Sequence, residues 1–268
     1  MTSHRLRVPA CMIIVAAFVL AACSSQPKPA PPPTPSAPSV TVPLDGWQLT
    51  LPVADPSSGG ADTVNPARLS PPWLTQTEGG ITFWAPVGGA TTPNSSHSRT
   101  ELVSKDSFPA GTQPRTLTAS LTVTQLPTQN PDVILGQIHG AGDLKSVPYV
   151  MLHYFDGAVK VVVKQAQTGD ASMTYPLADD VPLSTPFTFH ISDNGNGSLT
   201  FALDAGGHTT TATSPVPAPF SGADVRFQVG AYQQAESAQA SGPDDGARVT
   251  FSAITISKEA AAPATPTP

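Results

Sequence analysis

The sequence predicts an all-β protein, a sandwich, jelly roll or barrel of short antiparallel strands, and three observations support this fold class. Segments in which apolar and polar residues alternate recur at short spacing, as they do in strands that bury one face. Turns rich in glycine and proline separate these segments, and the 268-residue chain contains 21 Gly and 31 Pro. No segment keeps a helical period over three turns, which favours strands throughout.

The first 23 residues are interpreted as a lipoprotein signal peptide. Arg5 and Arg7 precede an apolar run over residues 10–22, which is too short to span a bilayer comfortably but suits a signal-peptide core. The run ends in Leu-Ala-Ala-Cys at Cys23, which resembles a bacterial lipobox. Cys23 would then carry acyl chains that hold the exported protein on the cell membrane, facing away from the cytoplasm. The alternative is an ordinary secretory signal that is cleaved elsewhere, which would make the protein secreted.

Composition divides the remaining chain into a tether, one folded domain and a tail. Residues 24–43 contain eight prolines, which favour extended conformations and predict a stiff tether. Residues 259–268 are rich in Ala, Pro and Thr and predict a disordered tail. We therefore expect one folded, monomeric domain over residues 44–258.

Charge and cysteine usage exclude several classes of protein. The net charge of −6 excludes an overall basic nucleic-acid-binding protein, so no nucleic acid is expected among the partners. Both cysteines lie within the first 23 residues, so the domain can form no internal disulfide. The six histidines show no HExxH or other close metal-ligand spacing, so a zinc enzyme is not expected.

Strands are predicted along the whole domain, and two pairs of them flank turn sequences. Asp156-Gly157 separates two apolar segments and predicts a tight hairpin, and residues 193–197 predict a second turn. Residues 235–240 are the best helical candidate, although the pattern is short. The strands are expected over residues 80–85, 115–126, 150–155, 158–165, 187–192, 199–204, 225–234 and 248–257.

Three further segments place polar side chains on one face of a strand in an otherwise charge-poor protein. In SRTEL, alternation puts Arg99 and Glu101 on one face, and in GQIHG it does the same for Gln137 and His139. Taken singly, each has a structural explanation, such as a surface ion pair or a structural histidine. The third segment, RFQVGAYQQ, has a polar side formed by Arg226, Gln228, Gly230, Tyr232 and Gln234.

Together the segments resemble the family 7 polysaccharide lyases, the alginate lyase group. The family pattern is R-[ST]-E-L-R, then Q-[IV]-H, then Y-F-K-A-G-x-Y-x-Q, and this chain has RTEL, QIH and RFQVGAYQQ in the same order. WQLTLP at residues 47–52 is similar to the W-x-L-T-L-P with which these domains often begin. The resemblance spans the folded domain. It implies a β-jelly roll of two antiparallel sheets with substrate in a concave groove, and the catalytic residues Arg99, Gln137, His139 and Tyr232.

The chain departs from the family pattern at three positions. Val103 replaces the second arginine of the first motif, Arg226 replaces the first tyrosine of the third, and Gln228 replaces its lysine. Positions 226 and 228 share a face, about 7 Å apart along the strand. A cation is lost at one position and gained at the other, so the charge of the groove is kept while its position shifts. Substrate-binding contacts are expected from Glu101, Arg226, Gln228 and Gln234.

These residue types suit β-elimination on a uronate, which removes the proton at C5 of the sugar and expels the glycosidic oxygen at C4. Arg99 and the amide of Gln137 can neutralise the adjacent carboxylate. His139 can donate to that carboxylate or accept the C5 proton. Tyr232 can protonate the departing oxygen, and for some uronates it can also take the proton. Glu101 would orient Arg99, and the scheme requires no metal or other cofactor.

The sequence therefore predicts a lyase that cleaves an anionic uronate polymer, with alginate as the expected substrate. In the family, isoleucine in Q-I-H tends to accompany guluronate-containing substrate, so Ile138 favours that block, while glucuronan and other polyuronates stay open. A non-catalytic carbohydrate-binding lipoprotein is the main alternative, and a glycoside hydrolase is another, although no strand carries an E-x-D-x-x-E pattern. Cations expected as candidates to line the groove are Lys105, Lys145, Lys160, Lys164 and Arg226.

Overall fold

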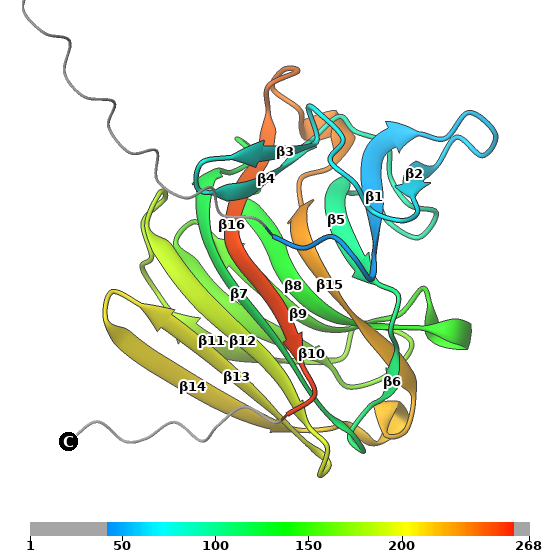
Figure 1. The fold of residues 1–268 in the computed structure, drawn as a ribbon, viewed down its shortest axis with the longest axis vertical. Helices are drawn as coiled ribbons and strands as arrows, with labels where there is room; N and C mark the ends of the chain where they lie inside the picture. The colour runs from blue at the N-terminus through cyan, green and yellow to red at the C-terminus, as the bar shows by residue number, and fades with distance from the viewer. Residues whose placement is uncertain (1–41, 260–268) are drawn as a thin grey trace, which may run out of the picture. The chain divides into compact units, whose positions relative to one another are not determined.

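The computed structural model describes residues 42–259, which form two antiparallel β-sheets (Figure 1). Within this range, sheet A has nine strands in the order β11-β10-β9-β8-β15-β5-β1-β2, with β6 paired to β15. Sheet B has, over the same residues, seven strands in the order β14-β13-β12-β7-β16-β4-β3. The predicted signal peptide with Cys23, and all but the last two residues of the predicted tether, lie outside the described residues.

In the described part of the chain, the strands of both sheets and three short 3₁₀ helices have the following bounds. Sheet A contains β1 (Trp47–Ala54), β2 (Ala61–Val64), β5 (Arg99–Ser104), β6 (Phe108–Pro109), β8 (Asp132–Gly140), β9 (Pro148–Phe155), β10 (Ala158–Lys164), β11 (Ser172–Ala178) and β15 (Asp224–Gln233). Sheet B contains β3 (Leu74–Thr77), β4 (Gly80–Pro86), β7 (Pro114–Gln125), β12 (Pro186–Asn194), β13 (Ser198–Ala205), β14 (His208–Pro215) and β16 (Gly246–Ser257). The 3₁₀ helices are η1 (Gly142–Leu144), η2 (Ala218–Phe220) and η3 (Ser237–Gln239).

The strands predicted from alternation are all present, and the predicted all-β, two-sheet jelly roll is confirmed. The turn between β9 and β10 has positive φ at both central residues, 45° at Asp156 and 93° at Gly157, as a tight hairpin of the predicted kind requires. The segment over 235–240 forms only the three-residue 3₁₀ helix η3. No helix among residues 42–259 is long and apolar enough to cross a membrane.

The sequence did not predict the edge strands of the two sheets. Strands β2 and β11 end sheet A, and β3 and β14 end sheet B. Each buries at most one of its side chains, so each lacks the alternation that marks the central strands.

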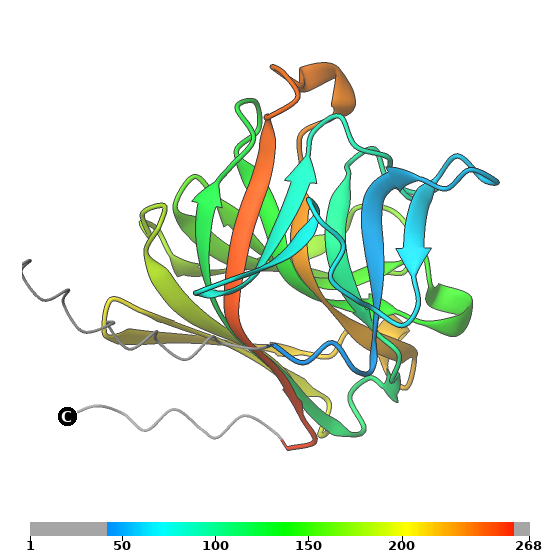
Figure 2. The same cartoon turned by 45° about the horizontal axis from the view of Figure 1, so that its top comes forward.

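Apolar side chains from the facing sides of both sheets form one core, and Figures 1 and 2 show the sheets lying against each other. In β7 the predicted apolar set, Leu117 to Val123 at every second position, is buried there. Phe83 and Phe251 of sheet B meet edge-on, with ring centroids 5.2 Å apart. Because one face of sheet A is committed to this core, its other face is free to carry polar side chains.

Candidate active site

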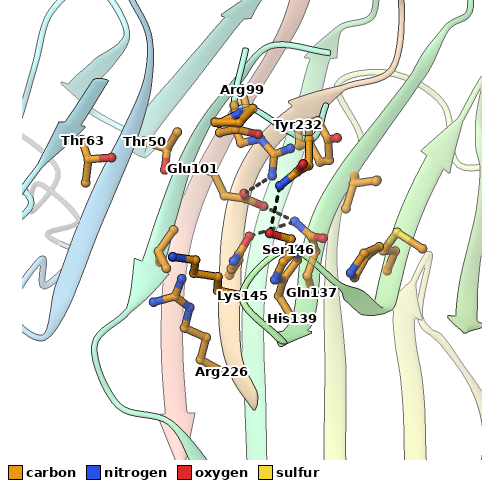
Figure 3. A pocket seen from close by; sticks show the side chains of 18 of the residues that line it. Thr50, Thr63, Arg99, Glu101, Gln137, His139, Lys145, Ser146, Arg226 and Tyr232 are labelled. Carbon is orange, nitrogen blue, oxygen red and sulfur yellow. Dashed lines mark hydrogen bonds and ion pairs between the residues drawn. The ribbon is translucent and has the colours of Figure 1, made fainter. Parts of the chain in front are cut away.

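A hollow of about 460 Å³ lies on the face of sheet A that points away from the core (Figure 3). Side chains of β5, β8 and β15 line it, together with residues of β1, β2 and β9 and of three loops. The hollow is lined by every residue predicted for catalysis or substrate binding: Arg99, Glu101, Gln137, His139, Arg226, Gln228, Tyr232 and Gln234.

Strand β15 brings the three sequence segments together, because it pairs with β5 on one side and with β8 on the other. Tyr232 lies opposite Arg99 in the pairing with β5. Gln228 lies opposite Gln137, and Arg226 lies opposite His139, in the pairing with β8. Residues directly opposite each other in an antiparallel pair point to the same face, so these registers bring the polar sides of all three segments together.

A buried polar network forms the floor of the hollow. Glu101 accepts hydrogen bonds from Nη1 of Arg99 at 3.2 Å and from Nε2 of Gln137 at 2.5 Å. Gln137 Nε2 also lies 3.3 Å from Oε1 of Gln228. Burial raises the pKa of Glu101, although Arg99 and Gln137 oppose this shift by favouring the charged carboxylate. Since both oxygens of Glu101 are occupied, its carboxylate fixes the arrangement of Arg99 and Gln137.

Two arginines of the hollow have donor groups without a protein partner. Among the described residues, Nε of Arg99 and Nε of Arg226 are buried and donate to no acceptor. Leaving such donors unsatisfied is costly, so the site is suited to an anionic ligand that supplies the missing acceptors. The guanidinium carbon of Arg99 also lies 3.4 Å from the centroid of the Tyr232 ring, which holds the two side chains together.

His139 is held in a form that can accept a proton. Burial lowers the pKa of His139 to about 4, and the charges of Arg99 and Arg226 act in the same direction. The imidazole is therefore neutral at pH 7. Its Nδ1 lies 3.1 Å from the carbonyl oxygen of Gly140, which can only accept, so Nδ1 carries the hydrogen and Nε2 keeps its lone pair.

Only part of the predicted cationic lining is present. Lys145 and Arg226 line the hollow, whereas Lys105, Lys160 and Lys164 do not. The ammonium groups of Lys160 and Lys164 have other partners. Nζ of Lys160 lies 5.5 Å from the centroid of the Phe155 ring, and Nζ of Lys164 lies 3.8 Å from a carboxylate oxygen of Asp170.

Several residues of the hollow were missed by the sequence analysis. Asn94, in the loop between β4 and β5, donates to Oγ of Ser146, in the loop between β8 and β9, at 2.9 Å. These loops carry no recognisable pattern that would have indicated the contact. Ile134 also lines the hollow and lies opposite Tyr232, because the pairing of β15 with β8 shifts between Val229 and Tyr232. Within residues 42–259, no three His, Cys, Asp or Glu side chains gather as a metal site would require.

The two-sheet sandwich and its arginine-lined hollow, with a neutral histidine and a tyrosine, define a polysaccharide lyase. The sequence profile of the alginate lyase family matches residues 42–258, and the chain belongs to this family. Its members act on an anionic polysaccharide, so the non-catalytic binding protein considered above is not favoured. No curated protein matches the sequence.

Solved structures of alginate lyases share the fold. An alginate lyase from Pseudomonas aeruginosa is 25% identical, with a TM-score of 0.71, and the match covers 81% of this chain and 100% of that one. An alginate lyase from Klebsiella pneumoniae is 21% identical with a TM-score of 0.68, over 81% and 96% of the two chains. The alginate lyase A1-II', described as a member of polysaccharide lyase family 7, is 23% identical with a TM-score of 0.69, over 81% and 96%. A variant of A1-II' has also been solved with a bound substrate, GGMG.

Proposed function

We propose that this protein cleaves alginate by β-elimination in the hollow on sheet A. One observation carries the proposal: a neutral histidine, a tyrosine hydroxyl and an arginine with an unpartnered Nε line the same hollow. A uronate needs these three groups at once, because its carboxylate must be neutralised while one proton leaves C5 and another reaches the glycosidic oxygen.

In the proposed reaction Arg99 binds the carboxylate of the sugar whose C5 proton is removed. The unpartnered Nε of Arg99 donates to that carboxylate, and Glu101 holds the guanidinium in place from below. Gln137 can join by exchanging its long, 3.3 Å bond to Gln228 for one to the substrate. Nε2 of His139 accepts the C5 proton, the C5–H electron pair forms the C4=C5 double bond, and Tyr232 gives its proton to the departing oxygen.

Arg226 and Lys145 are proposed to bind the carboxylates of neighbouring sugars. Neither side chain donates to a protein acceptor among the described residues, and both line the hollow. Their charges explain how a chain with net charge −6 can bind a polyanion, since the local field of the hollow attracts the substrate. Gln228 and Gln234 complete the proposed polymer-binding face.

The test is to incubate the domain with a panel of polyuronates and to follow the ultraviolet absorbance of the new C4=C5 double bond. Guluronate-rich alginate is the expected preference, with mannuronate-rich alginate and glucuronan as the comparison. Ile138 is fully buried and points into the core, so it can influence this preference only through packing beneath His139. Binding of all three polymers without any absorbance change would show a binding protein instead.

We further propose that the protein is exported and anchored to the membrane through acyl chains on Cys23. The apolar run over residues 10–22 and the Leu-Ala-Ala-Cys sequence that ends it support this proposal. The proline-rich residues 24–43 would then separate the lyase domain from the membrane surface.

A further inference from the structure

A serine that no sequence motif indicated lies directly against the hydroxyl of Tyr232. Ser95 belongs to the loop between β4 and β5, and its Oγ lies 2.8 Å from the Tyr232 hydroxyl oxygen. The same Oγ donates to the backbone carbonyl of His97 at 3.0 Å and accepts the backbone N–H of His97 at 3.0 Å. Nδ1 of His97 lies 3.2 Å from the carbonyl oxygen of Ala235, which ties the loop to the chain just beyond Tyr232.

The hydrogen atoms available to these groups fix the direction of the contact. A hydroxyl has one hydrogen to donate and two positions at which it accepts. Because a carbonyl oxygen only accepts, Ser95 gives its hydrogen to His97, and Tyr232 must be the donor in the 2.8 Å bond. Both acceptor positions of Ser95 are then filled, by Tyr232 and by the backbone of His97. In the protein without substrate, the hydrogen of Tyr232 therefore points at Ser95.

We propose that Ser95 is a positioning residue for Tyr232 that changes from hydrogen-bond acceptor to donor during the elimination. The inference rests on the proposed function. When Tyr232 gives its proton to the glycosidic oxygen, the electron pair of the breaking C4–O bond stays on that oxygen and a phenolate remains on the enzyme. The C5 proton goes to His139, and its electron pair forms the double bond. The Tyr232 hydrogen first turns from Ser95 to the glycosidic oxygen, and rotation about the Cβ–Oγ bond then turns the Ser95 hydrogen from the His97 carbonyl to the phenolate.

Ser95→Ala and Ser95→Thr test this role, because the first removes the hydroxyl and the second keeps it. We expect Ser95→Ala to lower kcat about ten- to a hundredfold, as befits loss of a hydrogen bond to a charged group, with KM within about twofold of wild type. Ser95→Thr, which keeps the hydroxyl, should have a kcat within about fivefold of the wild-type value. Ser96→Ala is the matched control: its hydroxyl, in the same loop, lies 3.3 Å from Nε2 of His97, and its removal should leave kcat and KM unchanged.

The outcomes separate this inference from the proposed function. A wild-type protein that forms no double bond on any polyuronate overturns both. An active wild type with a Ser95→Ala variant whose kcat stays within about twofold overturns the role of Ser95 alone. Equal losses in Ser95→Ala and Ser95→Thr, or a loss confined to KM, also overturn it, because they would indicate a role in shaping the loop.

Discussion

Replacing Tyr232 with phenylalanine removes one oxygen from the proposed chemistry and leaves the ring in place. The Arg99 guanidinium lies 3.4 Å from the ring centroid, a contact that phenylalanine retains, so polymer affinity should stay nearly unchanged. General acid–base groups contribute about 10²- to 10⁴-fold to rates. Tyr232→Phe should therefore lower kcat by at least about a hundredfold, measured by the absorbance of the C4=C5 double bond on saturating alginate.

The effect on folding should be small by comparison. Among residues 42–259, the lost hydroxyl makes one hydrogen bond, to Ser95 at 2.8 Å, and such a bond contributes about 0.5–1.5 kcal/mol to stability. For a domain of this size, 1 kcal/mol corresponds to a change of about 2–4 °C in melting temperature, so Tm should fall by about 1–6 °C. Tyr175→Phe is a matched control, because its hydroxyl donates to Ser214 at 2.9 Å and lies outside the hollow. It should lower Tm comparably and leave kcat unchanged.

The refuting result is a folded Tyr232→Phe enzyme whose kcat lies within about tenfold of wild type. In that case the proton that reaches the glycosidic oxygen has another source, and the assignment of roles in the hollow is wrong. A large loss of kcat in Tyr175→Phe as well would show instead that the assay reports general destabilisation.

Four further predictions concern the base, the polymer-binding face and the anchor. His139→Asn should lower kcat about 10²- to 10⁴-fold, more on guluronate-rich than on mannuronate-rich alginate, because inverting C5 moves its proton to the other ring face. Since the pKa of His139 is lowered to about 4, kcat/KM should hold from neutral pH down to about pH 5 and fall below it as the base is protonated; a midpoint near 6.5 would contradict this. Arg226→Ala should raise KM for long polymer, most strongly at low salt, where charges are least screened, whereas the exposed Arg68→Ala should not. Cys23→Ser should release the protein from washed membranes, and a variant that stays bound would disprove the lipid anchor.

The sequence alone determined the features that depend on neighbouring residues. Alternation located the central strands, and Asp156-Gly157 identified a tight hairpin. The same two-residue period placed Arg99 with Glu101, and Gln137 with His139, on common faces, because a strand turns successive side chains to opposite sides. The edge strands were not predicted, since a strand that buries almost nothing carries no alternation.

Only the tertiary structure decided which distant residues meet. The register of β15 with β5 places Tyr232 beside Arg99, and its register with β8 places Arg226 beside His139. The sequence of a strand does not by itself specify which residues of a neighbouring strand it pairs with. The need for glycine at position 136 is likewise visible only in the folded protein, because a Cβ there would lie 2.6 Å from the Phe189 ring of sheet B. The pairing of β8 with both neighbours shifts just before this glycine, and Ile134 lies on the face of the hollow.

Contacts between segments far apart in the chain also determine three details of the hollow. They lower the pKa of His139 and bring Ser95 against Tyr232. They also place Lys145 in the lining of the hollow, where the other candidate lysines are absent. Burial and electrostatic fields are properties of the packed molecule, so the residue types could be predicted from the sequence while their protonation and partners could not.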